Sequence, residues 1–334
     1  YYDFEIGHYL FELIGLTLVS YIIWALLSFL IQTLITDRYV GLFIMIVLFI
    51  GIPLLGAAGV EQSIFKYNAG TGYSYSDMNG YGSSLNRFFL YKIYWLSLGL
   101  VFYILTSLFY FRGLPSSFKE RIVIAKSRFK GKYPKFLGIF LLIFLSTGGY
   151  LYYETNILNK RTTSKEGELQ TVEWEKKYKK YENYSQPRIV SVNVDVNIFP
   201  KTLDADASGT YVMVNKTANV IDSLFLNHND AISTFEFNKE TDLVLEDTLY
   251  NFDIYKLKKA LYPGDSLNLF FTVKNKPNSK IRINSSVVSN GTFLNNSAFP
   301  SFGYPGGELT DDKTRKKYDL PPNKLKPHPS DSTA

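Results

Sequence analysis

Side chains suited to metal or nucleophilic chemistry are scarce in this sequence. The chain of 334 residues has no cysteine and three histidines, which are His8, His228 and His328. No two of these histidines have metal-ligand spacing on a common element, so no zinc site is expected. An acyl-transfer triad would need one of these isolated histidines, and no serine lies in a nucleophile elbow. The sequence therefore predicts neither a metal site nor a catalytic triad.

Other residues that could do chemistry are better explained as structural. Asp311 and Asp312 are adjacent carboxylates, but their segment, Thr310–Tyr318, has acids first and bases last. The dipole of a short helix favours this order, so we interpret the pair as a helix start. A glycine-rich loop at residues 70–82 lacks the Lys-Ser/Thr of a phosphate-binding motif. We predict no catalytic, cofactor-binding or metal-binding residue, and we expect that this chain is not an enzyme by itself.

Long apolar runs fill the first half of the chain. A helix needs about 20 predominantly apolar residues to cross a bilayer, and a soluble protein of this length could not cover so much apolar surface. We therefore predict a four-helix transmembrane module in residues 1–153. Its spans are expected at about residues 10–35, 40–60, 88–111 and 136–153.

Three residues within these runs carry specific expectations. Pro53 is expected to bend the second helix because it cannot donate a backbone hydrogen bond. Glu12 and Lys92 are the only candidates for an intramembrane ionic site, and each lies near one end of its run. Both are expected at interface depth, where a long side chain can reach water.

The charges of the loops predict the orientation. The segment between the third and fourth spans has a single acid, Glu120, against eight bases: Arg112, Lys119, Arg121, Lys126, Arg128, Lys130, Lys132 and Lys135. This excess places the loop in the cytoplasm. The loop Glu61–Arg87 and everything after Tyr153 are then outside. The charges thus predict a multi-pass membrane protein with an extracytoplasmic C-terminal domain.

The second half begins with a predicted helix. Thr163 and Glu166 have the spacing of a capping box, and a helix is expected from there to about Tyr181. We interpret residues 154–186 as a helical connector that leads out of the membrane.

An antiparallel β-sandwich is predicted at residues 187–320. Apolar and polar residues alternate from Ile189 to Ile198, as in a half-buried strand, and no long helix separates the later strands. Further strands are expected at Gly209–Val214, Ser233–Phe237, Asn251–Leu257, Leu267–Val273 and Ser286–Phe293. Residues 321–334 form a Pro-rich tail or linker. The predicted fold class is a multidomain membrane protein, a four-helix transmembrane module followed by this sandwich.

Several motifs resemble one known family, and their order is consistent with it. Asp3-Phe-Glu-Ile-Gly-His-Tyr-Leu-Phe-Glu12 and Ser76-Asp-Met-Asn-Gly-Tyr-Gly82 resemble the permease part of a bacterial ABC-transporter permease fused to an aminopeptidase. The motifs of the second half resemble the N-terminal β-domain of aminopeptidase-N-type zinc metallopeptidases. They are Val194-Asp-Val-Asn-Ile-Phe-Pro200, Gly209-Thr-Tyr-Val-Met-Val-Asn-Lys-Thr217, Tyr262-Pro-Gly-Asp-Ser-Leu267, Val288-Ser-Asn-Gly-Thr-Phe293, Glu308-Leu-Thr-Asp-Asp312 and Arg315-Lys-Lys-Tyr-Asp-Leu-Pro-Pro322.

The resemblance implies a permease whose helices line part of a pathway driven by a separate ABC ATPase subunit. The outer domain of such a fusion would precede a catalytic zinc domain. This sequence has no H-E-x-x-H helix and lacks upstream permease helices, so no catalytic or metal residue is carried over. The absence of an initiator Met and the Pro-rich end lead us to expect a piece of a longer polypeptide.

We therefore expect a permease fragment with a non-catalytic outer β-domain. Its expected partners are the lipid bilayer, an ABC ATPase subunit at the cytoplasmic loop and further permease helices. The alternative is a membrane-anchored sensor or binding protein whose sandwich captures a peptide or another partner. No nucleic-acid partner is expected despite the net charge of +6, because the bases cluster beside apolar runs.

Overall fold

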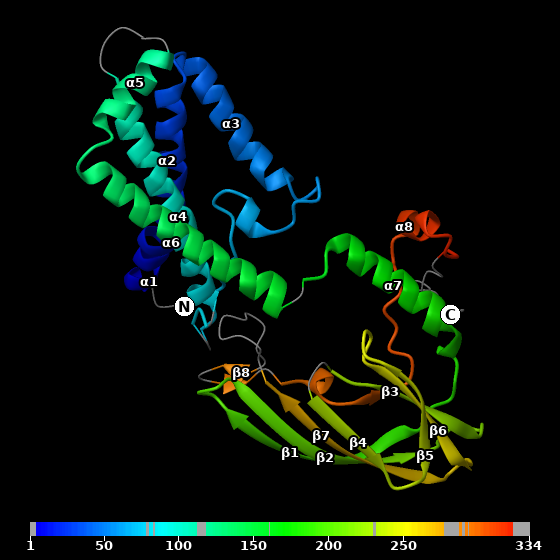
Figure 1. The fold of residues 1–334 in the computed structure, drawn as a ribbon. Coiled ribbons are helices and arrows are strands. Elements are labelled where there is room, and N and C mark those ends of the chain that lie inside the picture. The colour runs from blue at the N-terminus through cyan, green and yellow to red at the C-terminus, as the bar shows by residue number, and fades with distance from the viewer. Residues whose placement is uncertain are drawn as a thin grey trace. The chain divides into compact units, whose positions relative to one another are not determined.

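The chain folds into two compact units. One unit comprises Tyr1–Arg161 with Asn278–Ile283, and the other comprises Thr162–Pro277 with Asn284–Ala334 (Figure 1). The structure, a computed structural model, describes residues 5–77, 80–82, 84–111, 118–159, 161–229, 232–276, 287–288, 291–292 and 294–322. Several predicted features lie outside these residues in whole or in part. They include Asp3 and Phe4 of the first motif, Met78 and Asn79 of the second, Arg112 of the basic loop, half of the strand at 286–293, and nearly all of the tail with His328.

Among the described residues, the first unit has three helices that are long and apolar enough to cross a membrane. The first runs from Ile6 to Leu34 and consists of α1 (Ile6–Leu10), the π-helical η1 (Phe11–Thr17) and α2 (Leu18–Leu34). The others are α4 (Ser84–Phe109), and α6 (Lys132–Tyr152) continued by the π-helical η3 (Tyr153–Leu158). They cover the first, third and fourth predicted spans.

The second predicted span is a shorter helix. α3 (Arg38–Leu54) has 17 residues and is therefore about 25 Å long, less than the ~30 Å of a hydrocarbon core. It begins at Asp37, whose carboxylate accepts hydrogen bonds from the backbone of Tyr39 and Val40. Pro53 lies in its last turn, one residue before the helix ends at Leu54.

Glycines allow α4 to approach its neighbours closely. A β carbon on Gly99 would lie 2.9 Å from a methyl of Leu26 on α2, and one on Gly148 of α6 would lie 2.8 Å from the ring of Tyr94 on α4. α4 is accordingly the most buried helix of this unit. The unit is completed by η2 (Ser63–Phe65) and α5 (Phe118–Arg128).

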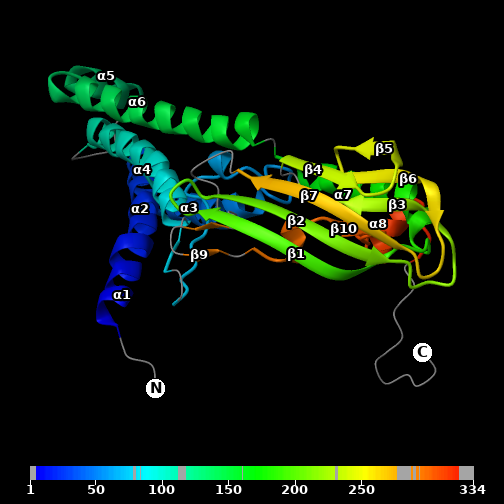
Figure 2. The same ribbon diagram turned by 90° about the horizontal axis from the view of Figure 1, so that it is seen from below.

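The second unit contains two antiparallel sheets of four strands each. The first sheet has the order β1-β2-β7-β4, made of β1 (Arg188–Phe199), β2 (Asp204–Val214), β7 (Ser266–Asn275) and β4 (Ile232–Phe237) (Figure 2). The second has the order β10-β3-β6-β5, made of β10 (Ser301–Phe302), β3 (Ile221–Asn227), β6 (Phe252–Leu261) and β5 (Thr241–Asp247). A separate pair is formed by β8 (Val287–Val288) and β9 (Gly291–Thr292).

The two sheets share one apolar core, so the predicted antiparallel sandwich is present. Met213 and Leu269 of the first sheet and Leu224 and Leu261 of the second are completely buried in the same cluster. The alternation predicted for β2 and β7 places one side of each strand in this core. Strands β3 and β5 were not among the predicted strands.

Helix α7 (Ser164–Tyr178) packs on the second sheet. The predicted capping box between Thr163 and Glu166 is confirmed, and the helix continues as η4 (Lys179–Tyr181). Trp174 and Tyr178 share a buried cluster with Phe252 of β6. By these contacts the helix is part of the β unit. The unit also contains η5 (Asn296–Ala298) and α8 (Asp312–Lys317).

Candidate functional site

A buried lysine marks the interior of the helical unit. Lys92 on α4 is 7% exposed. Its Nζ donates to the side-chain oxygen of Asn68 at 2.9 Å and to the backbone oxygen of the same residue at 3.4 Å. Both acceptors are neutral, so neither contact supplies a counter-charge to the ammonium group. Lys92 is therefore tied to the loop before α4 and does not extend along the surface.

The same loop is bound to both neighbouring helices. The hydroxyl of Tyr67 donates to the backbone oxygen of Ile23 at 2.7 Å, and the amide of Asn68 donates to that of Ser20 at 3.0 Å. On the other side, the indole of Trp95 donates to the backbone oxygen of Ala69 at 2.6 Å. Asn68 has a φ of 59°, which brings its side chain back towards α4. These hydrogen bonds hold the loop between α2 and α4.

Glu12, the second ionic candidate, lies in a separate cluster. Its carboxylate accepts a hydrogen bond from Tyr81 at 3.0 Å and lies 3.6 Å from the ring nitrogen of His8. The rings of His8 and Tyr75 are 4.0 Å apart. Burial, together with Glu12, raises the pKa of Tyr81 to about 12, so this phenol stays a hydrogen-bond donor at neutral pH. The structure does not bring Glu12 and Lys92 together as one ion pair.

Helix α5 is attached to the ends of two long helices by arginines. Arg121 donates to the backbone oxygen of Thr33 at 2.9 Å, near the end of α2. Arg128 donates to the backbone oxygen of Tyr110 at 2.5 Å, just after α4. Carbonyls at a helix C-terminus lack intrahelical partners and carry the negative end of the helix dipole. The two guanidinium groups therefore cap α2 and α4 and fix α5 against them.

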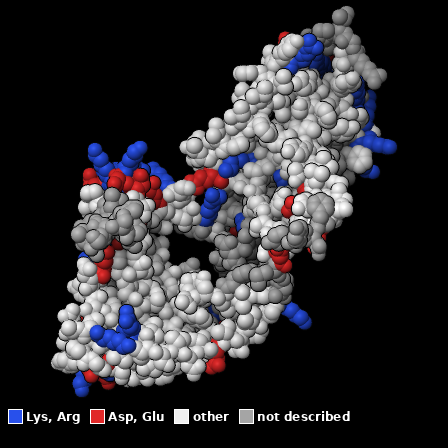
Figure 3. Space-filling model, turned by 180° about the vertical axis from the view of Figure 1, so that it is seen from behind, with Lys and Arg blue, Asp and Glu red and all other residues white. Residues whose placement is uncertain are grey.

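The exposed surface of α5 is mixed, with more bases than acids. Its exposed residues are Phe118, Lys119, Glu120, Val123, Lys126, Ser127 and Arg128. Figure 3 shows Lys and Arg gathered at the end of the helical unit that carries α5, while the flanks of the helices have few charges. This surface combines a net positive charge with two exposed apolar side chains, Phe118 and Val123.

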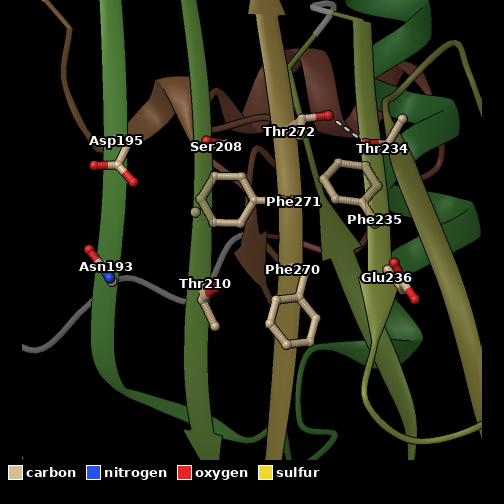
Figure 4. Close-up of a pocket in the computed structure, with 11 residues that line it drawn as sticks. Asn193, Asp195, Ser208, Thr210, Thr234, Phe235, Glu236, Phe270, Phe271 and Thr272 are labelled. Carbon is tan, nitrogen blue, oxygen red and sulfur yellow. Dashed lines mark hydrogen bonds between the residues drawn. The ribbon is translucent and has the colours of Figure 1, made fainter.

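The first sheet of the β unit has a shallow groove on the side away from the core. The groove has a volume of about 580 Å³, and its lining includes Asp195 of β1, Glu236 of β4 and Phe270 of β7 (Figure 4). Thr234 and Thr272 are hydrogen-bonded across its floor at 2.5 Å. A ring flanked by carboxylates and hydroxyls can bind a polar or cationic ligand.

The acidic pair that the sequence offers for catalysis has a structural position. Asp311 is the N-cap of α8, and its carboxylate accepts a hydrogen bond from the backbone of Thr314 at 2.8 Å. The interpretation of this pair as a helix start is confirmed. Among the residues that the structure describes, no group of three His, Asp or Glu side chains could hold a metal ion.

The sequence did not reveal the contacts of Arg121 and Arg128. Their spacing of seven residues on a short helix between two apolar runs was the available signal. The partners are backbone carbonyls, which have no sequence signature. No family model matches this chain, and no curated protein matches it.

Proposed function

We propose that this chain is a membrane-embedded permease fragment of an ABC-type transporter that carries a non-catalytic β-domain outside the cytoplasm. The observation that carries the proposal is α5, a short basic helix that two arginines fix to the ends of α2 and α4. A force applied to this helix by a partner would be transmitted directly to both long helices.

Membrane insertion is supported by the apolar surface of the helices. Side chains such as Leu13 of η1, Phe43 of α3 and Leu142 of α6 are exposed. In water this surface would favour aggregation, whereas lipid covers it at no such cost. The exposed sides of α3 and α6 are also where further permease helices could pack.

The orientation follows from the same charges that the sequence shows. The basic segment between α4 and α6 belongs on the cytoplasmic side of a bacterial inner membrane. A cytoplasmic ATPase subunit would then meet the exposed side of α5. The β unit, which follows α6, would be extracytoplasmic.

A crosslinking experiment tests the partner. A photo-crosslinking amino acid is placed at Val123 on α5 or, as a matched control, at Leu142 on α6, since both side chains are 66% exposed. In native membranes Val123 should crosslink to a nucleotide-binding subunit, identified by the peptide of its phosphate-binding loop. Leu142 should crosslink to no such subunit. If neither position captures one, the transporter proposal fails.

The alternative function is a membrane-anchored sensor or binding protein, and the groove of the first sheet favours it. Substitution of Phe270 by Ala would remove the exposed ring of this groove. A sensor should then lose ligand binding while every contact of α5 persists. A permease should keep its interaction with the ATPase subunit after the same change.

A further inference from the structure

Strand β1 has an unpaired edge. It is 12 residues long and lies at the end of its sheet, paired with β2 on one side. Within the described part of the chain, no strand pairs with its other side. A long edge of this kind offers a row of backbone donors and acceptors to another strand.

The same strand also leaves apolar side chains exposed. Val192 is 59% exposed, Val196 is 38% exposed and Ile198 is 40% exposed. These residues lie on the core side of the sheet, because Val192 is opposite Tyr211, which is buried. The core side of β1 therefore has uncovered apolar surface beside its free edge. β1 thus has two independent features that another strand could cover: its outer backbone edge and its exposed apolar side chains.

The sequence of β1 matches itself when read in the opposite direction. Valine occupies positions 192, 194 and 196, and polar residues occupy the positions between them. In an antiparallel pair the side chains of directly opposed residues lie on the same face. A pair centred on Val194 opposes Val192 with Val196, Asn193 with Asp195, and Ser191 with Asn197.

We propose that β1 pairs antiparallel with β1 of a second copy of this chain, with Val194 on the two-fold axis. The pairing joins the two first sheets into one, and the valines of both strands form a continuous apolar row on the core side. An isologous contact of this kind closes after two subunits, so it produces a dimer and no fibre. The proposal does not depend on the transporter function.

Charge and local geometry favour this register over its nearest neighbours. A shift by one residue would oppose valines with polar residues. A two-fold axis at Asp195 would oppose two carboxylates, which is unfavourable. The pairing of β1 with β2 is irregular between Ile189 and Ser191, so the regular strand begins at Ser191. The chosen register uses only the regular part, from Ser191 to Asn197.

Cysteine crosslinking tests the contact without background, because the full chain has no cysteine. Directly opposed residues of an antiparallel pair have α carbons about 4.5–5.5 Å apart, within the roughly 4.4–6.8 Å that a disulfide spans. After oxidation in lipid nanodiscs or detergent, Val194→Cys should give a covalent dimer. Val244→Cys is the matched control, since Val244 is an exposed valine on β5, an edge strand of the other sheet. It should remain monomeric.

The register is tested with tagged chains that carry Asn193→Cys or Asp195→Cys. The two variants should crosslink to one another after mixing, and neither should crosslink efficiently to itself. A second pair of variants changes the charge: Asn193→Asp opposes Asp195 of the other copy, and Asn193→Lys complements it. The dissociation constant should rise for the first and fall for the second, on the order of tenfold each.

Three results would overturn the proposal. These are a monomeric chain at all concentrations, equal crosslinking of Val194→Cys and Val244→Cys, and a dissociation constant that the two substitutions of Asn193 leave unchanged. The charge variants lie on the polar side of β1, so they leave the apolar core intact. A loss of dimer in Asn193→Asp with a gain in Asn193→Lys cannot result from misfolding.

Discussion

At the scale of single residues, the β unit depends on a buried ion pair. Arg315 of α8 is 1% exposed and Glu175 of α7 is 2% exposed, and they form two hydrogen bonds of 2.6 and 2.9 Å. Arg315→Ala would leave the buried carboxylate without its two hydrogen bonds, with only the partly exposed Lys179 as a cation, 3.6 Å away. The free energy of unfolding should fall by about 3 kcal/mol, the low end for a broken buried pair. Pulse proteolysis of the full chain in urea, read on the fragment of the β unit, measures this change.

The control for this prediction is another pair between the same two helices. Lys317 and Glu168 are 2.7 Å apart but lie at the surface. Lys317→Ala should have little effect, because solvent screens an exposed pair. If both variants lowered the free energy of unfolding equally, burial would not explain the effect of Arg315→Ala.

Two carboxylates predict how the stability of the β unit depends on pH. Burial raises the pKa of Glu175, but the hydrogen bonds and charge of Arg315 outweigh it, so the net pKa is below its usual value. The pKa of Asp247 is likewise lowered by Lys177 and Tyr178 against the effect of burial. The stability that these two carboxylates contribute is therefore fully present above about pH 4, where they are also ionised in the unfolded chain. This contribution should be lost as the pH falls through the pKa values that the two groups have in the folded protein. Thermal unfolding between pH 7 and pH 3 measures the loss, and the melting temperature of Glu175→Gln should depend less on pH.

Residue contacts were predictable from the sequence only where they are local. Thr163 and Glu166 lie within one helical turn, so their capping box follows from spacing alone. Glu175 and Arg315 are 140 residues apart, and their contact requires the folded sandwich between them. Lys92 and Asn68 are nearer in sequence, but their contact depends on the path of the loop.

At the scale of elements, α5 carries a prediction about topology. Single cysteines can be placed at two exposed residues, Ser127 on α5 and Thr202 between β1 and β2. A membrane-impermeant maleimide added to spheroplasts should label Thr202→Cys and leave Ser127→Cys unmodified. Opened membranes should label both. Labelling of Ser127→Cys in intact spheroplasts would contradict a cytoplasmic α5.

The sequence predicted helices and strands well where one hydrophobic pattern, a long apolar run or a strict alternation, continues through the whole element. Long apolar runs gave three helices of spanning length, and alternation gave β1, β2 and β7. β5 was missed because its pairing is irregular between Leu243 and Leu245, which interrupts the alternation. β3 was missed because Leu224, Phe225 and Leu226 are all buried, so it does not alternate. Hydropathy alone also extended the second predicted span to residue 60, beyond the end of α3 at Leu54.

At the scale of the whole molecule, the β unit begins at Thr162 and includes α7. A fragment from Thr162 to the C-terminus should therefore be soluble and unfold cooperatively. A fragment from Pro187, where the sequence predicts the sandwich to begin, lacks α7. It exposes Phe252 and leaves the guanidinium of Arg315 buried without Glu175. The second fragment should aggregate, or unfold at a much lower urea concentration. If circular dichroism and urea titration find the two fragments equally stable, α7 is only a connector and its contacts with the sheet contribute nothing.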